Sequence, residues 1–286
     1  MADRIPVSKT YKLFIGGKFP RTESGRYFPL HDDKGRLLAN VCQGSRKDFR
    51  NAVVAARKAF PGWSGASAYL RGQILYRIAE MLESRREGFV EELVLQGAGR
   101  RAARSEVETS IDRLVHYAGW SDKYGQLFSA VNPVTSPHFN FSVPEPTGVV
   151  AVIAPRDPGL LGLVSNLAPA LAGGNTVVAL ASEKIPLSAV SLAEVIHASD
   201  VPGGVVNILT GLEAELAGQF ASHMDVNALV HCGDEARSAE LQVSAAENLK
   251  RLLLRTGRDW TREDAQDPYL ILDTQEIKTT WHPVGG

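Results

Sequence analysis

Two places in the sequence combine residue types that could do chemistry. Residues 153–158 (IAPRDP) set an arginine beside an aspartate, Arg156 and Asp157, directly after an apolar run. In an open α/β sheet, ligands bind at the carboxyl ends of the strands, so such a loop is a candidate ligand site. The alternative is a proline-stiffened loop that carries a solvent-exposed ion pair.

The second place is the pair His231 and Cys232, which Gly233 and Asp234 follow. A histidine lowers the pKa of a thiol and activates it as a nucleophile only when the two side chains meet. Adjacent residues on an extended chain point to opposite faces. The sequence therefore favours a buried, structural Cys232 over a nucleophile.

Other chemical patterns in the sequence are incomplete. Residues 97–102 (GAGRRA) match a dinucleotide-binding fingerprint, yet they follow an expected helix where that fingerprint needs a strand. Residues 16–18 (GGK) lack the upstream glycine and the Ser/Thr of a P-loop. The chain has no Gly-x-Ser-x-Gly elbow and no histidine pair at a zinc-binding spacing, so we expect no metal.

Composition limits the remaining possibilities. The chain has 286 residues, 44% of them hydrophobic, which is enough for a substantial core and excludes disorder. Thirty-one basic and thirty-two acidic residues give a net charge of -1, so bulk charge points to no nucleic-acid or membrane partner. Two cysteines, Cys42 and Cys232, fit a reducing compartment. Neither a signal segment nor a membrane span is expected, which predicts a cytoplasmic protein.

The first 125 residues predict a hairpin followed by helices. A turn at residues 16–17 would join two short strands. Helices are expected over 46–60, where Pro61 would end the run, and over about 70–96. A further helix is expected from Ser105 onward. Two pairs have the spacing of capping boxes: Ser45 with Asp48, and Ser105 with Glu108.

From residue 149 onward, continuous apolar runs alternate with helical patterns. The runs predict strands at residues 149–153, 175–180, 205–209, 228–230 and 252–254. The helical patterns cover residues 160–171, 188–197 and 235–249. Uniformly apolar strands separated by helices predict an α/β fold with a Rossmann-like parallel sheet covered on both faces.

Several motifs resemble those of aldehyde dehydrogenases. They are residues 15–18 (IGGK), 148–155 (GVVAVIAP), 167–178 (LAPALAGGNTVV), 202–211 (PGGVVNILTG) and 248–251 (NLKR). The match is collinear over most of residues 11–258, so the chain is identified as a member of that family. Within the family, it most resembles the degenerate second module of the two-module enzymes called family sixteen.

The positions that carry the family's chemistry are altered. The resemblance implies an oxyanion-hole asparagine where this chain has Asp157, whose carboxylate would repel the developing negative charge. It implies a general-base glutamate where the chain has Arg255, a guanidinium that accepts no proton. Neither Cys42 nor Cys232 stands where the family's nucleophile belongs. We therefore expect no catalytic residues.

The same resemblance implies three cofactor-binding residues: Ser182, Glu183 and Gly233. Glu183 could hold a ribose hydroxyl, although the family's neighbouring lysine is Leu180 here. Residues 231–234 (HCGD) replace the family's Phe-Thr-Gly-Ser, so Asp234 and Glu235 place carboxylates where a pyrophosphate would lie. We expect no cofactor, or at most weak NAD binding.

The family's catalytic domain is expected to be absent. After a Rossmann-like lobe of residues 1–259, residues 260–286 form a linker and a strand at 276–282, which resembles the family's C-terminal strand that pairs between subunits. An extended segment at about 132–146 interrupts the lobe and is expected to act with that strand in oligomerisation.

These expectations define a non-catalytic subunit or module that binds a full-length aldehyde dehydrogenase, a second copy of itself, or both. One alternative is a residual NAD-binding module of an assembly whose activity resides in another subunit. Another is a working oxidoreductase that uses Cys232 as its nucleophile.

Overall fold

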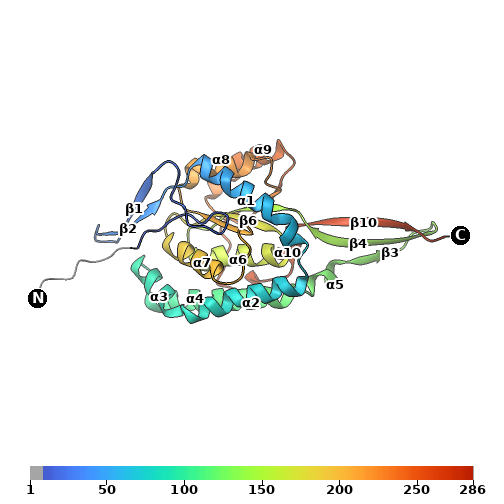
Figure 1. Ribbon diagram of the computed structural model, residues 1–286, viewed down its shortest axis with the longest axis horizontal. Coiled ribbons are helices and arrows are strands. Elements are labelled where there is room, and N and C mark those ends of the chain that lie inside the picture. Colours follow the sequence, from blue (N-terminus) through green and yellow to red (C-terminus); the bar gives the residue numbers. More distant parts are fainter. Residues whose placement is uncertain (1–8, 286) are drawn as a thin grey trace, which may run out of the picture.

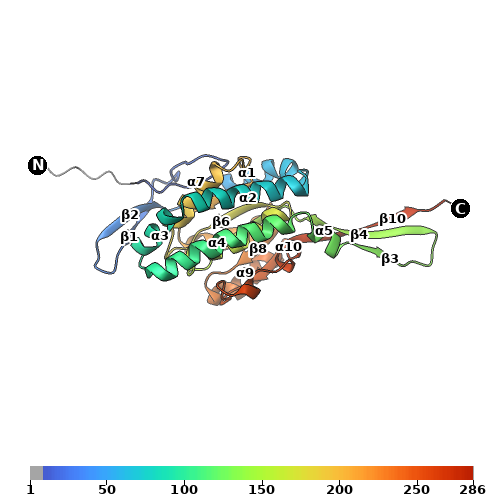
Figure 2. The same cartoon turned by 90° about the horizontal axis from the view of Figure 1, so that it is seen from below.

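A five-stranded parallel sheet lies at the centre of the computed structural model, which describes residues 9–285. Helices cover both faces of this sheet, and a two-stranded hairpin and a three-stranded antiparallel sheet project from opposite ends of the body (Figure 1). The turned view in Figure 2 shows the same two projections. Among the described helices, none combines the length and the apolar character needed to span a bilayer.

The strands of the central sheet are the predicted apolar runs, shifted by one residue at some ends. They are β5 (Val149–Ile153), β6 (Thr176–Leu180), β7 (Val206–Leu209), β8 (Ala228–His231) and β9 (Arg251–Leu254). Their order across the sheet is β7, β6, β5, β8 and β9, and every neighbouring pair is parallel. The predicted α/β fold with a Rossmann-like sheet is confirmed.

Helices bury the two faces of this sheet in two separate cores. Five helices cover one face: α2 (Ala68–Ser84), α3 (Arg86–Leu95), α4 (Arg100–Trp120), α6 (Gly159–Ala172) and α7 (Leu187–His197). Three helices cover the other face: α1 (Arg46–Ser64), α8 (Glu213–Ser222) and α9 (Ser238–Ala246). Val150 and Val152 of β5 enter the first core, whereas Val149, Ala151 and Ile153 enter the second, because successive strand residues point to opposite faces.

The helix starts test the predicted capping boxes. The box at Ser45 and Asp48 is confirmed, since each side chain accepts a hydrogen bond from the other's backbone N–H. The box at Ser105 is wrong, because α4 begins five residues earlier and Ser105 lies inside it. Residues 100–104 (RRAAR) all favour helix, so nothing stops the helix from extending to Gly99.

Two helix ends and one whole helix also differ from the prediction. Helix α1 passes Pro61 and ends at Ser64, because the buried Trp63 anchors its last turn by donating to the carbonyl of Leu171 (3.2 Å). The helix expected over 235–249 is a short 3₁₀ turn, η1 (Glu235–Arg237), followed by α9, which ends at Ala246. Helix α8 was not predicted from the sequence.

The predicted hairpin at residues 16–17 is only a turn. Ile15 and Lys18 form a single bridge there, while Phe14 exchanges backbone hydrogen bonds with Ile208 of β7 (2.9 and 2.8 Å). The two flanking segments do not pair as long strands because β7 takes up these backbone groups. The real hairpin lies further along the chain, where β1 (Tyr27–His31) pairs with β2 (Leu37–Cys42).

The projecting antiparallel sheet joins segments that lie far apart in the sequence. Its strands are β3 (Ala130–Asn132), β4 (His138–Pro146) and β10 (Gln275–Pro283), with β4 in the middle. Three short helical segments lead into it: α5 (Tyr124–Phe128), η2 (Glu263–Ala265) and α10 (Tyr269–Leu272). Between β9 and β10 the chain packs on the core, where Trp260 and Ile271 are fully buried. The two segments expected to be extended therefore pair with each other inside one chain.

Candidate functional site

The loops that follow β5, β6 and β8 meet at the carboxyl edge of the parallel sheet. Ser182, after β6, donates a hydrogen bond to the carbonyl of Arg156, after β5 (2.7 Å). The Arg156 guanidinium lies 3.9 Å from the carboxylate of Asp234, after β8. The structure therefore brings the predicted loops together, as adjacent parallel strands require.

Asp157 lies on the outside of this site. Its carboxylate is 2.7 Å from the ammonium of Lys184, and both side chains are more than half exposed. The loop is therefore the solvent-exposed ion pair considered above, although the partner of Asp157 is Lys184 and not Arg156.

Ser182 is buried and its hydroxyl is engaged inside the protein. Besides donating to Arg156, it accepts hydrogen bonds from the backbone N–H groups of Lys184 (3.2 Å) and Ile185 (3.1 Å). These three bonds use the hydroxyl to tie the β5 and β6 loops together.

Glu183 is also engaged inside the protein. Its carboxylate accepts a hydrogen bond from the backbone N–H of Glu213, the first residue of α8. A carboxylate is favoured there because the free N–H groups give a helix N-terminus a partial positive charge. Glu183 thus caps α8 from the neighbouring loop.

Glu213 is the residue that the sequence did not reveal. Its carboxylate accepts a hydrogen bond from the backbone N–H of Asp234 (3.0 Å) and lies 3.1 Å from Nε2 of His231. Glu213 is 4% exposed and His231 is not exposed. Burial alone would raise the pKa of Glu213, but the hydrogen bonds from His231 and the Asp234 backbone lower it below its ordinary value.

Gly233 leaves room for this buried carboxylate. A Cβ atom at Gly233 would lie 2.5 Å from Oε1 of Glu213, so a side chain there would collide with it. Asp234 caps η1 by accepting from the backbone N–H of Ala236 (3.1 Å), as its predicted place at the helix start implies. Glu235 is exposed, and the second carboxylate at this helix start is Glu213 instead.

Two further side chains cap helix N-termini at the same edge. Glu106 of α4 accepts hydrogen bonds from the backbone N–H groups of Leu160 (2.8 Å) and Leu161 (3.2 Å) at the start of α6. Gln96 accepts from the N–H of Leu187 at the start of α7 (3.0 Å). We name four residues the internal caps: Gln96, Glu106, Glu183 and Glu213. Each accepts a hydrogen bond from a backbone N–H at the N-terminus of a helical segment that follows one of the strands β5 to β8.

Arg255, directly after β9, is a buried structural group. Its guanidinium donates to Oδ1 of Asn166 in α6 (2.8 Å) and to Oδ2 of Asp273 (2.6 Å), two residues before β10. The side chain is 7% exposed. Arg255 therefore ties the edge of the parallel sheet to α6 and to the beginning of the projecting sheet.

The two cysteines are buried and unpaired with each other. Burial raises the pKa of the Cys232 thiol to about 12, so the thiolate form is disfavoured. The ring nitrogens of His231 face Glu213 (3.1 Å) and the hydroxyl of Ser238 (3.5 Å), away from the thiol. The expectation that His231 and Cys232 diverge is confirmed.

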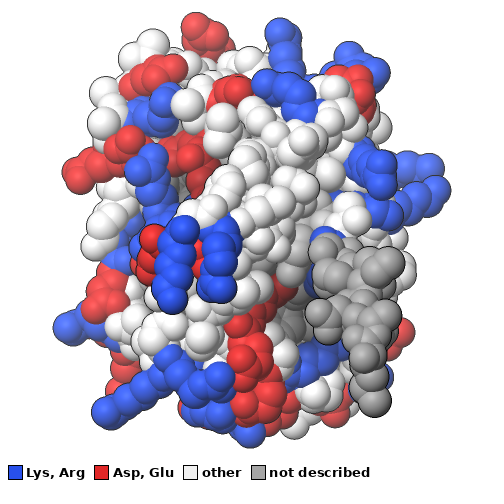
Figure 3. Space-filling model, turned by 90° about the vertical axis from the view of Figure 1, so that its left-hand side faces the viewer, with Lys and Arg blue, Asp and Glu red and all other residues white. Residues whose placement is uncertain are grey.

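The surface offers few other features that would hold a ligand. Within residues 9–285, no group of three or more His, Cys, Asp or Glu side chains could hold a metal ion. Figure 3 shows basic and acidic side chains interspersed at the end of the body that carries β1 and β2. A groove of about 940 Å³ lies on α2 and α4, around Tyr76, Val115 and Pro202. Pro202 precedes β7, so this groove lies toward the amino ends of the strands, opposite the candidate site.

The parallel sheet and the loops at its carboxyl edge define a Rossmann-like α/β protein. The family model described as the aldehyde dehydrogenase family matches residues 21–264, and the chain belongs to that family.

Known relatives support this membership. The mitochondrial benzaldehyde dehydrogenase of Antirrhinum majus is 33% identical over 280 residues, which cover 95% of this chain and 50% of the relative. Retinal dehydrogenase 2 of Gallus gallus is 34% identical over 256 residues, covering 87% and 49%. The NAD+ complex of an aldehyde dehydrogenase from Bacillus cereus superposes with a TM-score of 0.83 at 28% identity, covering 87% and 51%. The chain thus spans about half the length of the relatives that it matches.

Proposed function

We propose that this chain is a non-catalytic subunit or module of an aldehyde dehydrogenase assembly, with a structural or regulatory role. One observation carries the proposal: Arg255 stands where the family resemblance puts the general base. Its buried guanidinium is bonded to Asn166 and Asp273, so it is a fixed donor that accepts no proton. The exposed Asp157 and the buried thiol of Cys232 agree with the loss of chemistry.

The short path from β9 to β10 supports the same proposal. By resemblance, the family's catalytic domain would lie in this stretch, which here comprises residues 255–274. Trp260 and Ile271 fill the core along it, and Arg255 bonds to Asp273 near its end. In the proposed subunit, this connection therefore packs on the core in the place of a catalytic domain.

The proposed subunit works without a cofactor. A pyrophosphate binds where a helix start presents free backbone N–H groups. At the carboxyl edge of this sheet, the internal caps already accept hydrogen bonds from those groups. A dinucleotide would have to displace these side chains, among them the buried carboxylate of Glu213, to bind there, which supports a subunit that binds no NAD.

The proposed partner surface is the projecting sheet, residues 132–146 and 276–282, and the partner is a full-length aldehyde dehydrogenase or a second copy. An exposed sheet edge is a ready template for another strand. We place the assembly in the cytoplasm, in keeping with the free thiols of Cys42 and Cys232.

Co-expression tests the proposal. A tagged chain is produced with a full-length aldehyde dehydrogenase of the same genome, and the purified material is examined by size exclusion with light scattering. We expect a complex that survives Val54→Asp on α1 but not Ile277→Asp on β10, two substitutions at similarly exposed apolar positions. A chain that never associates with such an enzyme or with itself, or that alone oxidises aldehydes, contradicts the proposal.

The second candidate function is a residual NAD-binding module whose assembly owes its activity to another subunit. It is favoured by Glu183, which is retained at the carboxyl edge of the sheet beside Ser182 and Gly233. A calorimetric titration with NAD separates the two candidates, because only this second function predicts saturable heat.

A further inference from the structure

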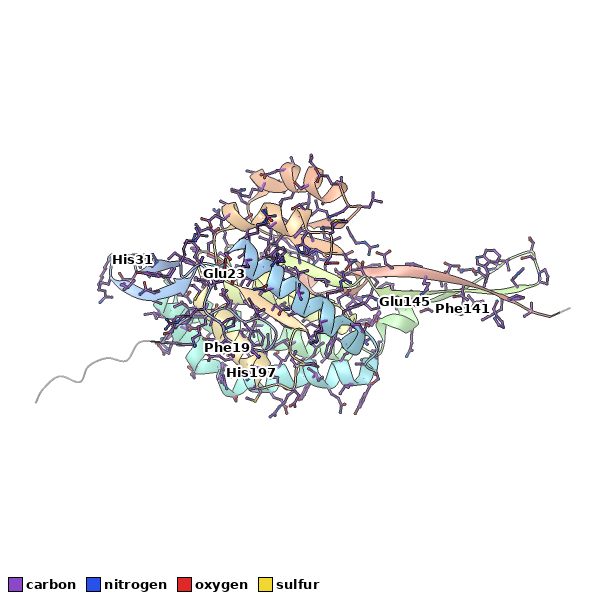
Figure 4. All side chains as sticks on the ribbon, turned by 45° about the horizontal axis from the view of Figure 1, so that its top comes forward. Phe19, Glu23, His31, Phe141, Glu145 and His197 are labelled. Atoms are coloured by element: carbon purple, nitrogen blue, oxygen red, sulfur yellow. The ribbon has the colours of Figure 1, made fainter. Side chains whose placement is uncertain are left out.

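Three polar side chains form a connected row at the carboxyl edge of the parallel sheet. They are Glu213 at the start of α8, His231 at the end of β8 and Ser238 at the start of α9. Nε2 of His231 lies 3.1 Å from the carboxylate of Glu213, and Nδ1 of the same ring lies 3.5 Å from the hydroxyl of Ser238. Helices α8 and α9 pack on each other at the top of the view in Figure 4, away from the projecting sheet that carries Phe141 and Glu145.

The carboxylate of Glu213 determines which ring nitrogen of His231 is free to accept a proton. The pKa of Glu213 lies below its ordinary value, so this side chain is ionised at neutral pH and only accepts hydrogen bonds. In the neutral imidazole, Nε2 therefore carries the hydrogen that Glu213 accepts, and Nδ1 is left as an acceptor. The group that faces Nδ1 is the hydroxyl of Ser238, so the free base of the ring lies beside a hydroxyl that can donate to it.

The acid and the base of this row are held inside the protein, whereas the hydroxyl lies nearer the surface. Glu213 is buried, and its carboxylate also accepts a hydrogen bond from the backbone N–H of Asp234 (3.0 Å). His231 is fully buried, while Ser238 is partly exposed in the first turn of α9. A buried carboxylate that orients a histidine, and a histidine that faces an accessible hydroxyl, are the parts of a serine triad.

The hydroxyl of Ser238 differs from those of serines inside helices. The hydroxyls of Ser110, Ser199 and Ser222 each donate to the backbone carbonyl four residues earlier (2.7, 2.6 and 2.8 Å). Ser238 is the first residue of α9, and within the described chain its side chain bonds to His231 instead. Its hydroxyl is therefore placed against a base, whereas the other three are bound to the backbone.

We propose that Ser238 is a nucleophile activated by His231 and Glu213, and that through it this chain hydrolyses esters with a small acyl group. The inference goes beyond the proposed function, because acyl transfer to a serine uses neither NAD nor a thiol. Ser238 is only partly exposed, which restricts the acyl group to a small one. Arg156, whose positive charge acts on Glu213, lies at the same edge of the sheet and favours the negative charge that develops on the ester oxygen.

The reaction consists of two successive acyl transfers. Oγ of Ser238 bonds to the carbonyl carbon of the ester while its proton moves to Nδ1 of His231. The bond from that carbon to the alkoxy oxygen then breaks, and the alcohol leaves with the proton from Nδ1. A water molecule attacks the acyl-serine in the same way, which releases the carboxylic acid and restores the hydroxyl. Glu213 stays ionised throughout and is a positioning residue, because Nε2 keeps its hydrogen.

Labelling with a fluorophosphonate tests the nucleophile in the full chain. An activated serine displaces fluoride from the phosphorus atom and stays covalently modified, whereas a serine without a base does not react. Peptide mass spectrometry should find the label on Ser238 and should find Ser222 unmodified. A chain in which Ser238 stays unlabelled, or in which another serine carries the label, overturns the inference.

Hydrolysis of p-nitrophenyl acetate by substituted chains tests the role of each group. Ser238→Ala should abolish the hydrolysis, and the matched control Ser222→Ala should retain it. His231→Gln keeps a donor for Glu213 but removes the base, so kcat should fall roughly a hundredfold while KM changes little. Glu213→Gln leaves the base in place without its orienting carboxylate, so it should also lower kcat with little change in KM.

Thermal unfolding of the same variants separates lost chemistry from lost structure. Ser238→Ala should keep the midpoint of Ser222→Ala, since both remove one hydroxyl from a helix. Hydrolysis that survives in Ser238→Ala overturns the inference, and so does a kcat in His231→Gln equal to that of the unsubstituted chain. A chain that oxidises aldehydes contradicts the proposed function instead, whereas a chain that binds its partner and hydrolyses no ester overturns only this inference.

Discussion

The carboxyl edge of the parallel sheet and the outer edge of β10 differ in whether their backbone groups have hydrogen-bond partners inside the protein. At the first, the internal caps take up the N–H groups of the helix starts, and the carboxylate of Glu213 is buried. At the second, no strand of the described chain pairs with the outer edge of β10, where the carbonyl of Gln275 accepts from Arg251 and the residues from Glu276 onward are exposed.

This difference separates the place where the family resemblance puts chemistry from the place where we propose that a partner binds. A ligand that uses a backbone N–H already bonded inside the protein must first break that bond. An open strand edge gains hydrogen bonds when another strand joins it. The chain has the fold of its family, and under the proposed function its binding surface is the projecting sheet and not the carboxyl edge of the parallel sheet.

The largest effect is expected at Arg255. Arg255→Glu restores a carboxylate at the position of the family's base, but it places that group beside Asn166 and Asp273 with no cation. Breaking a fully buried ion pair costs about 3 to 5 kcal/mol, and because the Asp273 side chain is 39% exposed we take the lower end, about 3 kcal/mol. We expect a loss of stability of that order in urea unfolding, and no aldehyde oxidation.

The matched control is Arg262→Glu, since Arg262 forms an exposed pair with Asp264. Exposed pairs contribute about 1 kcal/mol or less. Equal losses for the two variants, or activity in Arg255→Glu, would contradict the structural role of Arg255.

A smaller effect is expected at Glu213. Glu213→Gln weakens the hydrogen bonds with His231 and the Asp234 backbone, at a cost of about 2 kcal/mol near pH 7. The pKa of Glu213 lies below its ordinary value of 4.5 in the folded protein. Its carboxylate therefore stabilises the fold fully above that value, and this stabilisation is lost as the pH falls through the lower, folded pKa.

Urea unfolding at a series of pH values checks this dependence. The stability difference between the unsubstituted chain and Glu213→Gln should be constant near neutral pH and shrink below about pH 4.5. The exposed neighbour Glu235→Gln serves as the control. A difference that grows on acidification has the wrong sign and would refute the buried carboxylate.

The cap of α8 should have a still smaller effect. Glu183→Ala removes the carboxylate that accepts from the first N–H of that helix, and losing a cap costs about 1 kcal/mol. Lys184→Ala, at the exposed next residue, should change stability by less than half of this. Thermal unfolding measures both, and equal shifts would show that Glu183 does not act as a cap.

The smallest effect is expected on the projecting sheet. Phe139 is 46% exposed on β4, and exposed positions usually tolerate substitution within about 0.5 kcal/mol. Phe139→Ser should therefore leave the urea midpoint nearly unchanged. A large loss would mean that this sheet is part of the folded core and not an appended binding element.

The sequence predicts the central sheet well because its strands are uniform apolar runs. Residues 149–153 read as a strand without reference to the rest of the fold, and all five are buried in β5. The start of α1 could also be predicted from neighbouring residues alone, since Ser45 and Asp48 make a complete capping box. Helix α8 had no such signal, because Leu212 provides no side-chain cap.

The internal caps could not be predicted because their partners are remote in sequence. Glu106 reaches a helix start more than fifty residues away, and Glu213 meets His231 only after α8 packs on the sheet. The altered residue Arg255 was visible, but not its bonds to Asn166 and Asp273, which depend on how the path to β10 folds back. Local patterns thus predict the helices and strands, whereas the hydrogen bonds that cap the helix N-termini at the carboxyl edge depend on tertiary packing.

The central claim is that internal side chains close the carboxyl edge of the sheet to a dinucleotide. Titration calorimetry of the purified chain with NAD, up to about 1 mM, tests it most directly. The account predicts no heat beyond dilution, because the helix starts are already capped. A saturable heat with a Kd below that concentration would contradict it and establish the chain as an NAD-binding module.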